Sequence, residues 1–238
     1  MRRKLIERYL NRKGLTIVPR NGLCNLAGAL HRLQTRAIPF ETVVDVGASN
    51  GCWSEAALQF FPEARYLCVE AQRAHELALQ GFVAKHPNVE YVISAAGAET
   101  GEIYFEASDL FGGIASNKPF AQNCVRVPVT TIDLLVEQRR LPPPYLIKLD
   151  THGFEVPILS GAAKTLAQTE VLIVEVYNFT SGPPMLLFYD MCQHLAGKGF
   201  RCIDLFDPLY RPHDNAFWQI DMVFVRSSRP EFQYLGYY

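Results

Sequence analysis

From Thr42 onward, short apolar segments alternate along the chain with longer segments of helical periodicity. The segments TVVDV, YLCVE and VEYVIS are rich in β-branched and apolar residues, and helices are expected from about Ser54 and from about Ala74. Continuously apolar strands that alternate with helices are typical of parallel sheets covered by helices on both faces. The pattern therefore predicts an α/β fold built on a mostly parallel, Rossmann-like sheet.

An insertion interrupts this alternation. The segments EIYFEA and VRVPVT alternate polar with apolar residues, which predicts a β-hairpin insertion around the glycine-bearing loop LFGGIASNKPF. The α/β pattern then resumes, and the segments RCIDLF and QIDMVFVR are expected to close the sheet. The elements expected between them are a helix over residues 131–140, a strand over 145–150, a helix after Gly153, a strand over 171–176 and a helix over about 185–197.

Residues 1–40 are interpreted as an N-terminal helical extension of one large domain that spans residues 41–238. Within it, residues 26–36 have a helical pattern that is expected to pack against the sheet. The basic start, MRRKLIERYLNRK, is interrupted by charges too often for a signal-peptide core and is expected to form an exposed amphipathic helix. No run approaches the roughly 18 apolar residues of a membrane span, so no span is expected.

Charge and cysteine content narrow the function classes. The formal net charge of −1 gives no basic field that would gather nucleic acid, so a small-molecule acceptor is expected instead. The six cysteines are scattered among mostly apolar neighbours without CxxC pairs. Reduced thiols in a cytoplasmic protein are therefore expected, rather than disulfides or zinc ligands.

The segment VVDVGASNG is the strongest local motif, because an apolar strand runs directly into Asp45, Gly47, Ser49 and Gly51 before a helix. The first strand of a doubly wound sheet ends where ligands bind, and glycines let the backbone approach a ligand closely. A dinucleotide site has a glycine where this chain has Asp45, and an anion there would repel a pyrophosphate. The motif instead suits S-adenosylmethionine, whose amino-acid portion is expected close to Asp45 and the glycine loop.

Two further segments are expected to complete the cofactor site. Glu70 ends the second strand about 25 residues later, where a carboxylate can accept hydrogen bonds from ribose hydroxyls. Ser94 and Ala95 follow the third strand, and their small side chains leave room for a flat adenine ring. A plain turn into the hairpin is the alternative interpretation of Ser94.

The chain resembles the FkbM family of S-adenosylmethionine-dependent methyltransferases from about Thr42 to Arg226. The resemblance rests on DVGASNG, VEAQ, VPVTTIDLL, IKLDTHGFEVPILSGA and DMVFVR, and the chain differs from the family pattern at His152. It implies a class I methyltransferase sheet, mostly parallel with an antiparallel strand near the C-terminus. It also implies methylation of a hydroxyl on a sugar or another natural-product-like acceptor, with S-adenosylhomocysteine as the second product.

The strand that ends in IKLD carries the residues expected to do chemistry. Lys148 is charged inside an apolar strand, and pairing with Glu175 of the segment VLIVEV is favoured over a catalytic role. Asp150 is expected at the binding crevice, where it orients the cofactor ammonium or the acceptor hydroxyl. Methyl transfer requires in-line alignment and loss of the hydroxyl proton, and His152 or Asp150 can take that proton.

A metal site is not favoured by the sequence. Asp150, Glu175 and Asn178 are oxygen donors near strand ends, and Mg²⁺ prefers such ligands. The expected pairing of Glu175 with Lys148 competes with this use, so no metal ligand is assigned.

Two aromatic segments are expected to form the acceptor pocket. The first is the glycine-containing loop after EIYFEA, and the second is a loop over residues 206–218. Aromatic faces suit a sugar ring or a phenol, and an arginine can hold a phosphate or carboxylate. Packing is an equal alternative for these side chains, and the final YLGYY is either a frayed tail or a homodimer contact. The expected acceptor-binding residues are Phe111, Tyr210, Arg211, His213 and Trp218.

Three other hypotheses stay open at this point. They are an N-methyltransferase, a nucleotide-dependent oxidoreductase and a noncatalytic binding module with the same fold. The missing G-x-G-x-x-G pattern disfavours the oxidoreductase. The complete set of expected cofactor residues disfavours the noncatalytic module.

Overall fold

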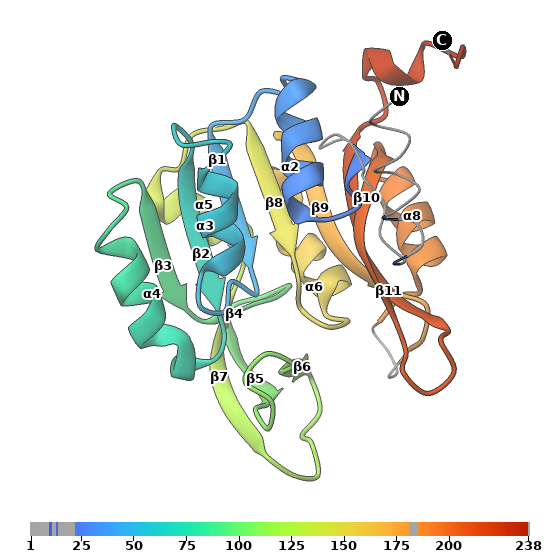
Figure 1. Cartoon of the computed structure of the whole chain (residues 1–238). Helices are drawn as coiled ribbons and strands as arrows, with labels where there is room; N and C mark the ends of the chain where they lie inside the picture. Colours follow the sequence, from blue (N-terminus) through green and yellow to red (C-terminus); the bar gives the residue numbers. More distant parts are fainter. Residues whose placement is uncertain (1–9, 11–12, 14–21, 181–184, 238) are drawn as a thin grey trace.

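A seven-stranded sheet forms the centre of the described chain, in the order β10-β11-β9-β8-β1-β2-β3 (Figure 1). The strands β3, β2, β1, β8 and β9 run parallel to one another, whereas β11 is antiparallel to both of its neighbours. This arrangement confirms the predicted α/β class, including the antiparallel strand near the C-terminus. The bounds are β1 Thr42–Val46, β2 Arg65–Glu70, β3 Val89–Ile93, β8 Tyr145–Leu149, β9 Thr169–Tyr177, β10 Phe200–Tyr210 and β11 Phe217–Arg226.

The computed structural model describes Leu10, Lys13, residues 22–180 and residues 185–237. The amphipathic helix predicted for MRRKLIERYLNRK therefore lies almost wholly outside the described residues. In the part of the chain that is described, every helix is too short or too polar to cross a bilayer. All six cysteines are described, and all are free thiols.

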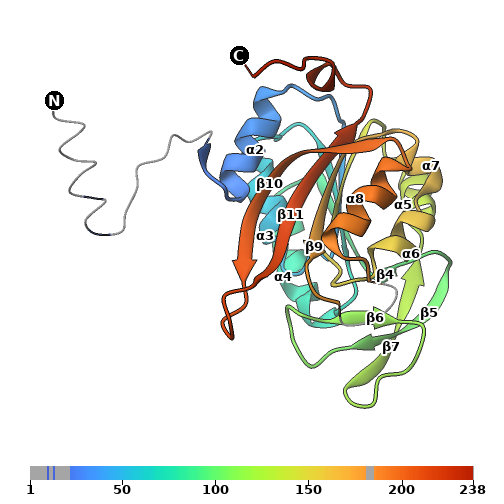
Figure 2. The same cartoon turned by 90° about the vertical axis from the view of Figure 1, so that its right-hand side faces the viewer.

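Helices cover both faces of the sheet, as the continuously apolar strands predict (Figures 1 and 2). One face carries α2 Leu26–Thr35, α3 Cys52–Leu58 and α4 Glu76–Val83, the last preceded by the 3₁₀ helix η2 Arg73–His75. The other face carries α5 Ile132–Arg139, α6 Glu155–Ser160, α7 Ala163–Leu166 and α8 Phe188–Ala196. A last 3₁₀ helix, η3 Pro230–Phe232, follows β11.

Helix α2 is held on the sheet by charge as well as by apolar packing. Its residues Leu30 and Leu33 are buried in the same core as α3 and α4. Arg32 and Arg36 both pair with Asp204 of β10, at 2.7 and 3.0 Å. The described part of the first 40 residues thus covers the sheet, and the boundary at residue 40 stays a prediction.

The predicted β-hairpin insertion forms a second, four-stranded sheet in the order β4-β7-β5-β6. Its long strands β5 and β7 are antiparallel, as the period-two segments predict. The predicted loop between them contains a further short strand, β6. In Figure 1 this sheet lies next to the carboxyl ends of the parallel strands. The bounds are β4 Ala95–Ala96, β5 Gly101–Glu106, β6 Ile114–Ser116 and β7 Cys124–Thr130.

The expected loop over residues 206–218 is wrong, because most of it is a β-hairpin. Strand β10 continues to Tyr210 and β11 begins at Phe217, which leaves only residues 211–216 as the turn. Asp207 and Pro208 resemble loop residues, but β10 is an edge strand, and an edge strand tolerates a proline. The pairing with β11 shifts register between Phe206 and Leu209 to accommodate them.

Candidate active site

A cavity of about 350 Å³ lies at the carboxyl ends of β1, β2 and β8. Phe105 and Ala115 of the small sheet form its opposite wall. Parallel α/β sheets bind ligands at this edge, and the volume is in the range of small-molecule sites. The predicted site residues that line the cavity are Gly47, Ser49, Glu70, Ser94, Ala95, Phe111, Asp150 and His152.

The loop after β1 brings two chain segments into unusually close contact. Gly47 has a φ of +75°, and a Cβ at this position would lie 1.9 Å from the carbonyl oxygen of Asp150. Only glycine therefore fits where the loop crosses the end of β8. The backbone N–H of Ser49 donates to Glu70 Oε2 at 2.7 Å, which joins the loop to the end of β2.

Glu70 is buried in the cavity wall with its carboxylate fixed by backbone groups. Ser49 N–H and Gln72 N–H donate to its two oxygens, each at 2.7 Å. A carboxylate offers about four acceptor positions, so further positions remain for a ligand. Glu70 can thus accept hydrogen bonds from a diol such as a ribose.

Ser94 and Ala95 form the junction between the two sheets beside the cavity. The Ser94 hydroxyl donates to the carbonyl of Pro128 at 3.0 Å, and Ala95 pairs with Val129 at the start of β4. These contacts keep the small side chains of Ser94 and Ala95 in the cavity wall. Ser94 can therefore both link the two sheets and line the cavity.

Asp45 does not line the cavity, so the expected direct contact with the cofactor is not supported. Side chains alternate along β1, and Asp45 points to the face covered by α3. There it is fully buried and accepts from Ser54 Oγ at 2.7 Å. Asp45 acts on the site through Lys148, whose Nζ lies 3.2 Å from Asp45 Oδ1.

Gly51 is also outside the cavity lining, and its role is in packing. It caps the start of α3 with a φ of +86°, and a Cβ there would lie 2.8 Å from the ring of Phe82 in α4. The glycine lets α3 begin close to α4. Its predicted contact with the cofactor is therefore not supported.

The predicted pair between Lys148 and Glu175 is wrong. Lys148 Nζ lies 3.2 Å from Asp150 Oδ2, and it donates to the carbonyl of Gly47 at 3.2 Å. In the register of β8 and β9, Lys148 is opposite Ile173, and Glu175 lies two residues farther along. Burial alone would lower the pKa of Lys148, but Asp45 and Asp150 outweigh it and raise this pKa, so the lysine stays charged.

Asp150, His152 and Glu175 meet at the end of the cavity next to β9. His152 Nε2 lies 3.5 Å from Asp150 Oδ1 and 3.8 Å from Glu175 Oε2. The backbone of His152 has a φ of +54°, in the left-handed region that few non-glycine residues adopt. Such residues are often found at functional sites.

Glu175 is a site residue that the sequence interpretation used only as a partner for Lys148. Tyr177 and Gln219 hydrogen-bond to its two carboxylate oxygens, and both Glu175 and Gln219 line the cavity. A charged residue inside the apolar segment VLIVEV is a signal that was visible in the sequence. Gln219 had no such signal, because only the pairing of β11 with β9 brings it there.

Burial and mutual repulsion shift the pKa values of this group of carboxylates. Burial and the nearby Asp150 raise the pKa of Glu175 to about 9. Asp221, opposite Glu175 on β11, has its pKa raised to about 7 by burial and by Asp150. Burial would also raise the pKa of Asp150, but Lys148 and His152 hold it below its usual value. Of these three carboxylates, Asp150 alone has a lowered pKa, because Lys148 lies beside it.

The loop that carries Phe111 lines the cavity and is held by the segment that follows β2. His75 Nε2 donates to the carbonyl of Leu110 at 2.8 Å, and the His75 ring lies 5.5 Å from that of Phe111. Gln72 Nε2 donates to the same carbonyl at 3.0 Å. The sequence interpretation missed Gln72 and His75, although Gln72 is part of the segment VEAQ.

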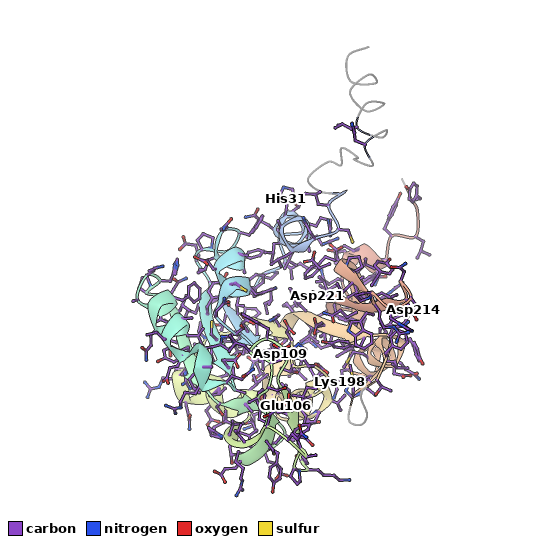
Figure 3. The ribbon with its side chains drawn as sticks, turned by 60° about the horizontal axis from the view of Figure 1, so that its bottom comes forward. His31, Glu106, Asp109, Lys198, Asp214 and Asp221 are labelled. Atoms are coloured by element: carbon purple, nitrogen blue, oxygen red, sulfur yellow. The ribbon has the colours of Figure 1, made fainter. Side chains whose placement is uncertain are left out.

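The other four predicted acceptor residues do not line the cavity. Arg211 pairs with Asp214 in the turn between β10 and β11, and Figure 3 shows Asp214 well apart from Asp109 beside the cavity loop. The ring of Trp218 stacks on Phe179 at 5.3 Å. These residues lie outside the lining because the hairpin of β10 and β11, and not a loop over the cavity, carries them. The four residues are Tyr210, Arg211, His213 and Trp218.

Comparison with known families identifies the protein class. The family model described as "Methyltransferase FkbM domain" matches residues 45–202. The chain belongs to the methyltransferase FkbM family. This family uses S-adenosylmethionine as methyl donor, so this compound is the cofactor of the chain and the predicted family is confirmed.

A curated relative of this FkbM protein is the hexuronic acid methyltransferase AglP of Haloferax volcanii. The two are 28% identical over 80 residues, which cover 34% of this chain and 33% of AglP. The chain thus spans about a third of the length of the relative it matches.

Three of the solved structures with a similar fold are 11–14% identical to the chain. The fibrillarin pre-rRNA processing protein of Methanococcus jannaschii has a TM-score of 0.49, with 84% of this chain and 75% of that chain covered. Sp1610 of Streptococcus pneumoniae, in complex with S-adenosyl-L-methionine, has a TM-score of 0.48, with coverage of 84% and 73%. The 1,6-didemethyltoxoflavin-N1-methyltransferase of Burkholderia thailandensis has a TM-score of 0.47, with coverage of 85% and 78%.

Proposed function

We propose that this FkbM protein transfers the methyl group of S-adenosylmethionine to a hydroxyl oxygen of a small, sugar-like acceptor. The observation that carries the proposal is the cavity with two chemically different ends. One end has Glu70 and the glycine loop, and the other has the cluster of Asp150, His152 and Glu175. The central strand β1 separates the two ends.

The first end suits the cofactor. Glu70 can accept hydrogen bonds from the ribose hydroxyls, and Ser94 and Ala95 leave space for the adenine ring. The loop of Gly47 and Ser49 leads from Glu70 toward the end of β8 and would hold the methionine portion. In that position the cofactor would present its methyl group to the cluster.

The second end suits a hydroxyl acceptor. An alcohol is a weak nucleophile, so its proton has to leave as the oxygen–carbon bond forms and the carbon–sulfur bond breaks. The cluster of Asp150, His152 and Glu175 lies within reach of the cavity and can orient the hydroxyl and take up its proton as a unit. In-line alignment of oxygen, methyl carbon and sulfur supplies the rest of the rate enhancement.

A sugar is the favoured acceptor class. The relative AglP is named as a methyltransferase of hexuronic acid, which is a sugar acid. The rings of Phe105 and Phe111 and the polar cluster line the same cavity, and sugars combine apolar ring faces with hydroxyl groups.

Removal of the Glu70 carboxylate tests the cofactor end. Glu70→Gln is expected to weaken binding of S-adenosylmethionine about 10- to 100-fold, since hydrogen bonds to a charged group contribute about 1.5–3 kcal/mol. Isothermal titration calorimetry measures this change. Glu63→Gln, an exposed residue outside the cavity, is the matched control and is expected to bind like the unchanged protein. Equal affinity in both variants would place the ribose elsewhere.

The identity of the nucleophile is tested with S-adenosylmethionine that carries ¹³C in its methyl group. The protein is incubated with neutral hexosides, a hexuronic acid and an amino sugar, and the products are examined by NMR. A new O-methyl signal together with S-adenosylhomocysteine is the expected result. An N-methyl signal from the amino sugar alone would replace the proposal with an N-methyltransferase.

A further inference from the structure

The acceptor end of the cavity has the donor spacing of a metal site. Asp150 and His152 lie in the loop after β8, and Glu175 lies in β9. One donor atom from each of the three residues lies within 4.8 Å of the other two. Donors that each lie about 2.1 Å from one ion at tetrahedral or octahedral angles are about 3.0–3.5 Å apart. The distances of 3.5 and 3.8 Å from His152 Nε2 to the two carboxylates are close to this range.

The orientation of His152 is fixed from outside the cluster. Its Nδ1 lies 3.1 Å from the carbonyl oxygen of Gly113, in the loop over the cavity. A carbonyl can only accept, so Nδ1 carries the proton and Nε2 of the neutral ring has a lone pair toward Asp150 and Glu175. Three atoms with lone pairs thus face one another, and a cation bound between them would offset their repulsion. Metal-binding histidines have this arrangement, with the other ring nitrogen donating to a carbonyl or carboxylate.

The two carboxylates of the cluster are also oriented by neighbours. Lys148 Nζ lies 3.2 Å from Oδ2 of Asp150. The other carboxylate oxygen of Asp150, Oδ1, faces His152. Tyr177 and Gln219 hydrogen-bond to Glu175. Outer residues of this kind hold the ligands of metal sites in place.

Acidic groups outnumber cations around the cluster. Three carboxylates, those of Asp45, Asp150 and Asp221, act on Lys148, which is the one buried lysine among the described residues. A fourth, that of Glu175, lies close to Asp150. Asp45 and Asp150 both pair with Lys148, whereas the described residues give Glu175 and Asp221 no lysine or arginine partner. Buried charges are usually paired or bind a metal. A divalent cation between Asp150 and Glu175 would give both carboxylates a cationic partner.

We propose that Asp150, His152 and Glu175 bind one divalent metal ion, of the class of Mn²⁺ or Zn²⁺. One imidazole and two carboxylates suit these ions better than Mg²⁺, which prefers oxygen ligands alone. The ligand set differs from the oxygen donors considered from sequence, because His152 replaces Asn178. Asn178 does not line the cavity and donates to the carbonyl of Phe217 at 3.3 Å.

The role of the ion rests on the proposed function. A divalent ion makes a hydroxyl that it coordinates more acidic. The hydroxyl O–H bond then breaks with loss of its proton to water, the oxygen bonds to the methyl carbon, and the bond from that carbon to sulfur breaks. When the ion is bound, His152 is one of its ligands and does not act as a free base.

Binding of Mn²⁺ is tested without any acceptor, by the loss of the free-ion signal in electron paramagnetic resonance. The unchanged full-length protein is expected to bind one ion per chain. Asp150→Asn, His152→Ala and Glu175→Gln are each expected to weaken binding at least about 10-fold, as disturbance of metal ligands or their supports does. His86→Gln, on a histidine outside the cavity, is the matched control and is expected to bind Mn²⁺ normally.

Thermal unfolding of the unchanged protein and the control is a second measurement, and it tests metal binding even if the cluster variants fold poorly. Because a ligand of the native state raises Tm, Mn²⁺ and Zn²⁺ should raise the Tm of the unchanged protein and of His86→Gln. No binding of either ion, or binding by all three cluster variants equal to that of the unchanged protein, would overturn the proposal. Methyl transfer that persists in excess EDTA would also overturn it but leave the proposed function intact. Metal binding at the cluster without any O-methyl product would support the site and refute the function.

Discussion

Replacement of His152 by alanine is expected to lower kcat for methyl transfer about 100- to 10,000-fold. The variant loses the nitrogen that faces Asp150 and Glu175, and with it the proton or metal ion that the cluster holds. Affinity for S-adenosylmethionine is expected to change little, because β1 lies between the His152 end of the cavity and Glu70. Single-turnover kinetics and calorimetry separate these two effects.

The control for this prediction is His86→Gln, whose side chain packs against Phe82 away from the cavity. Its kcat is expected to match that of the unchanged protein. A His152→Ala protein with normal kcat would remove His152 from the chemistry. A loss of cofactor affinity as large as the loss of kcat would instead make His152 part of the cofactor site.

Lys148→Met is expected to lower the free energy of unfolding by about 3–5 kcal/mol, because removal of one partner leaves a buried charge uncompensated. The methionine has a similar length but cannot neutralise Asp45, which is fully buried, or hold the carbonyl of Gly47. Urea denaturation followed by circular dichroism measures the change.

Two further variants decide the cause of that loss. Lys164→Met, at an exposed position of α7, is expected to change stability by less than about 0.5 kcal/mol. Asp45→Asn combined with Lys148→Met is expected to recover part of the lost stability, because the uncompensated carboxylate is gone. A double variant less stable than Lys148→Met would show that Asp45 contributes chiefly through its bond with Ser54.

Local sequence pattern was sufficient to predict most of the helices and strands of the central sheet. Strand β1 has the predicted bounds, and α5 lies within the predicted residues 131–140. These elements are buried on one or both faces, so their sequences carry a clear apolar period. The outer half of the β10–β11 hairpin has no such period, because its residues extend into solvent, and it was predicted as a loop.

The cofactor end of the site was predicted better than the acceptor end. Gly47, Ser49 and Glu70 lie at the ends of two adjacent parallel strands, and that neighbourhood follows from the order of the sheet. Asp45 was assigned to the cavity because it precedes the glycine loop. Its side chain lies on the other face of the sheet. Successive side chains of a strand point to opposite faces, so this direction depends on the position of Asp45 within the strand.

The acceptor end depends on contacts between distant segments. Glu175 and Gln219 come from β9 and β11, and Gly113 from the inserted hairpin, so no short motif contains the group that forms around His152. The partner of Lys148 likewise follows from the register of β8 with its neighbours, which places Asp45 beside it and Glu175 farther along.

The sequence by itself determined the α/β class, the family and the position of the cofactor loop, because each depends on periodicity and on short motifs within single elements. Only the tertiary structure decided that Lys148 pairs with Asp45 and Asp150, and that Asp150, His152 and Glu175 share one end of a cavity. The physical reason is that strand register and side-chain direction set which charges meet. A shift of one residue moves a side chain to the opposite face of the sheet.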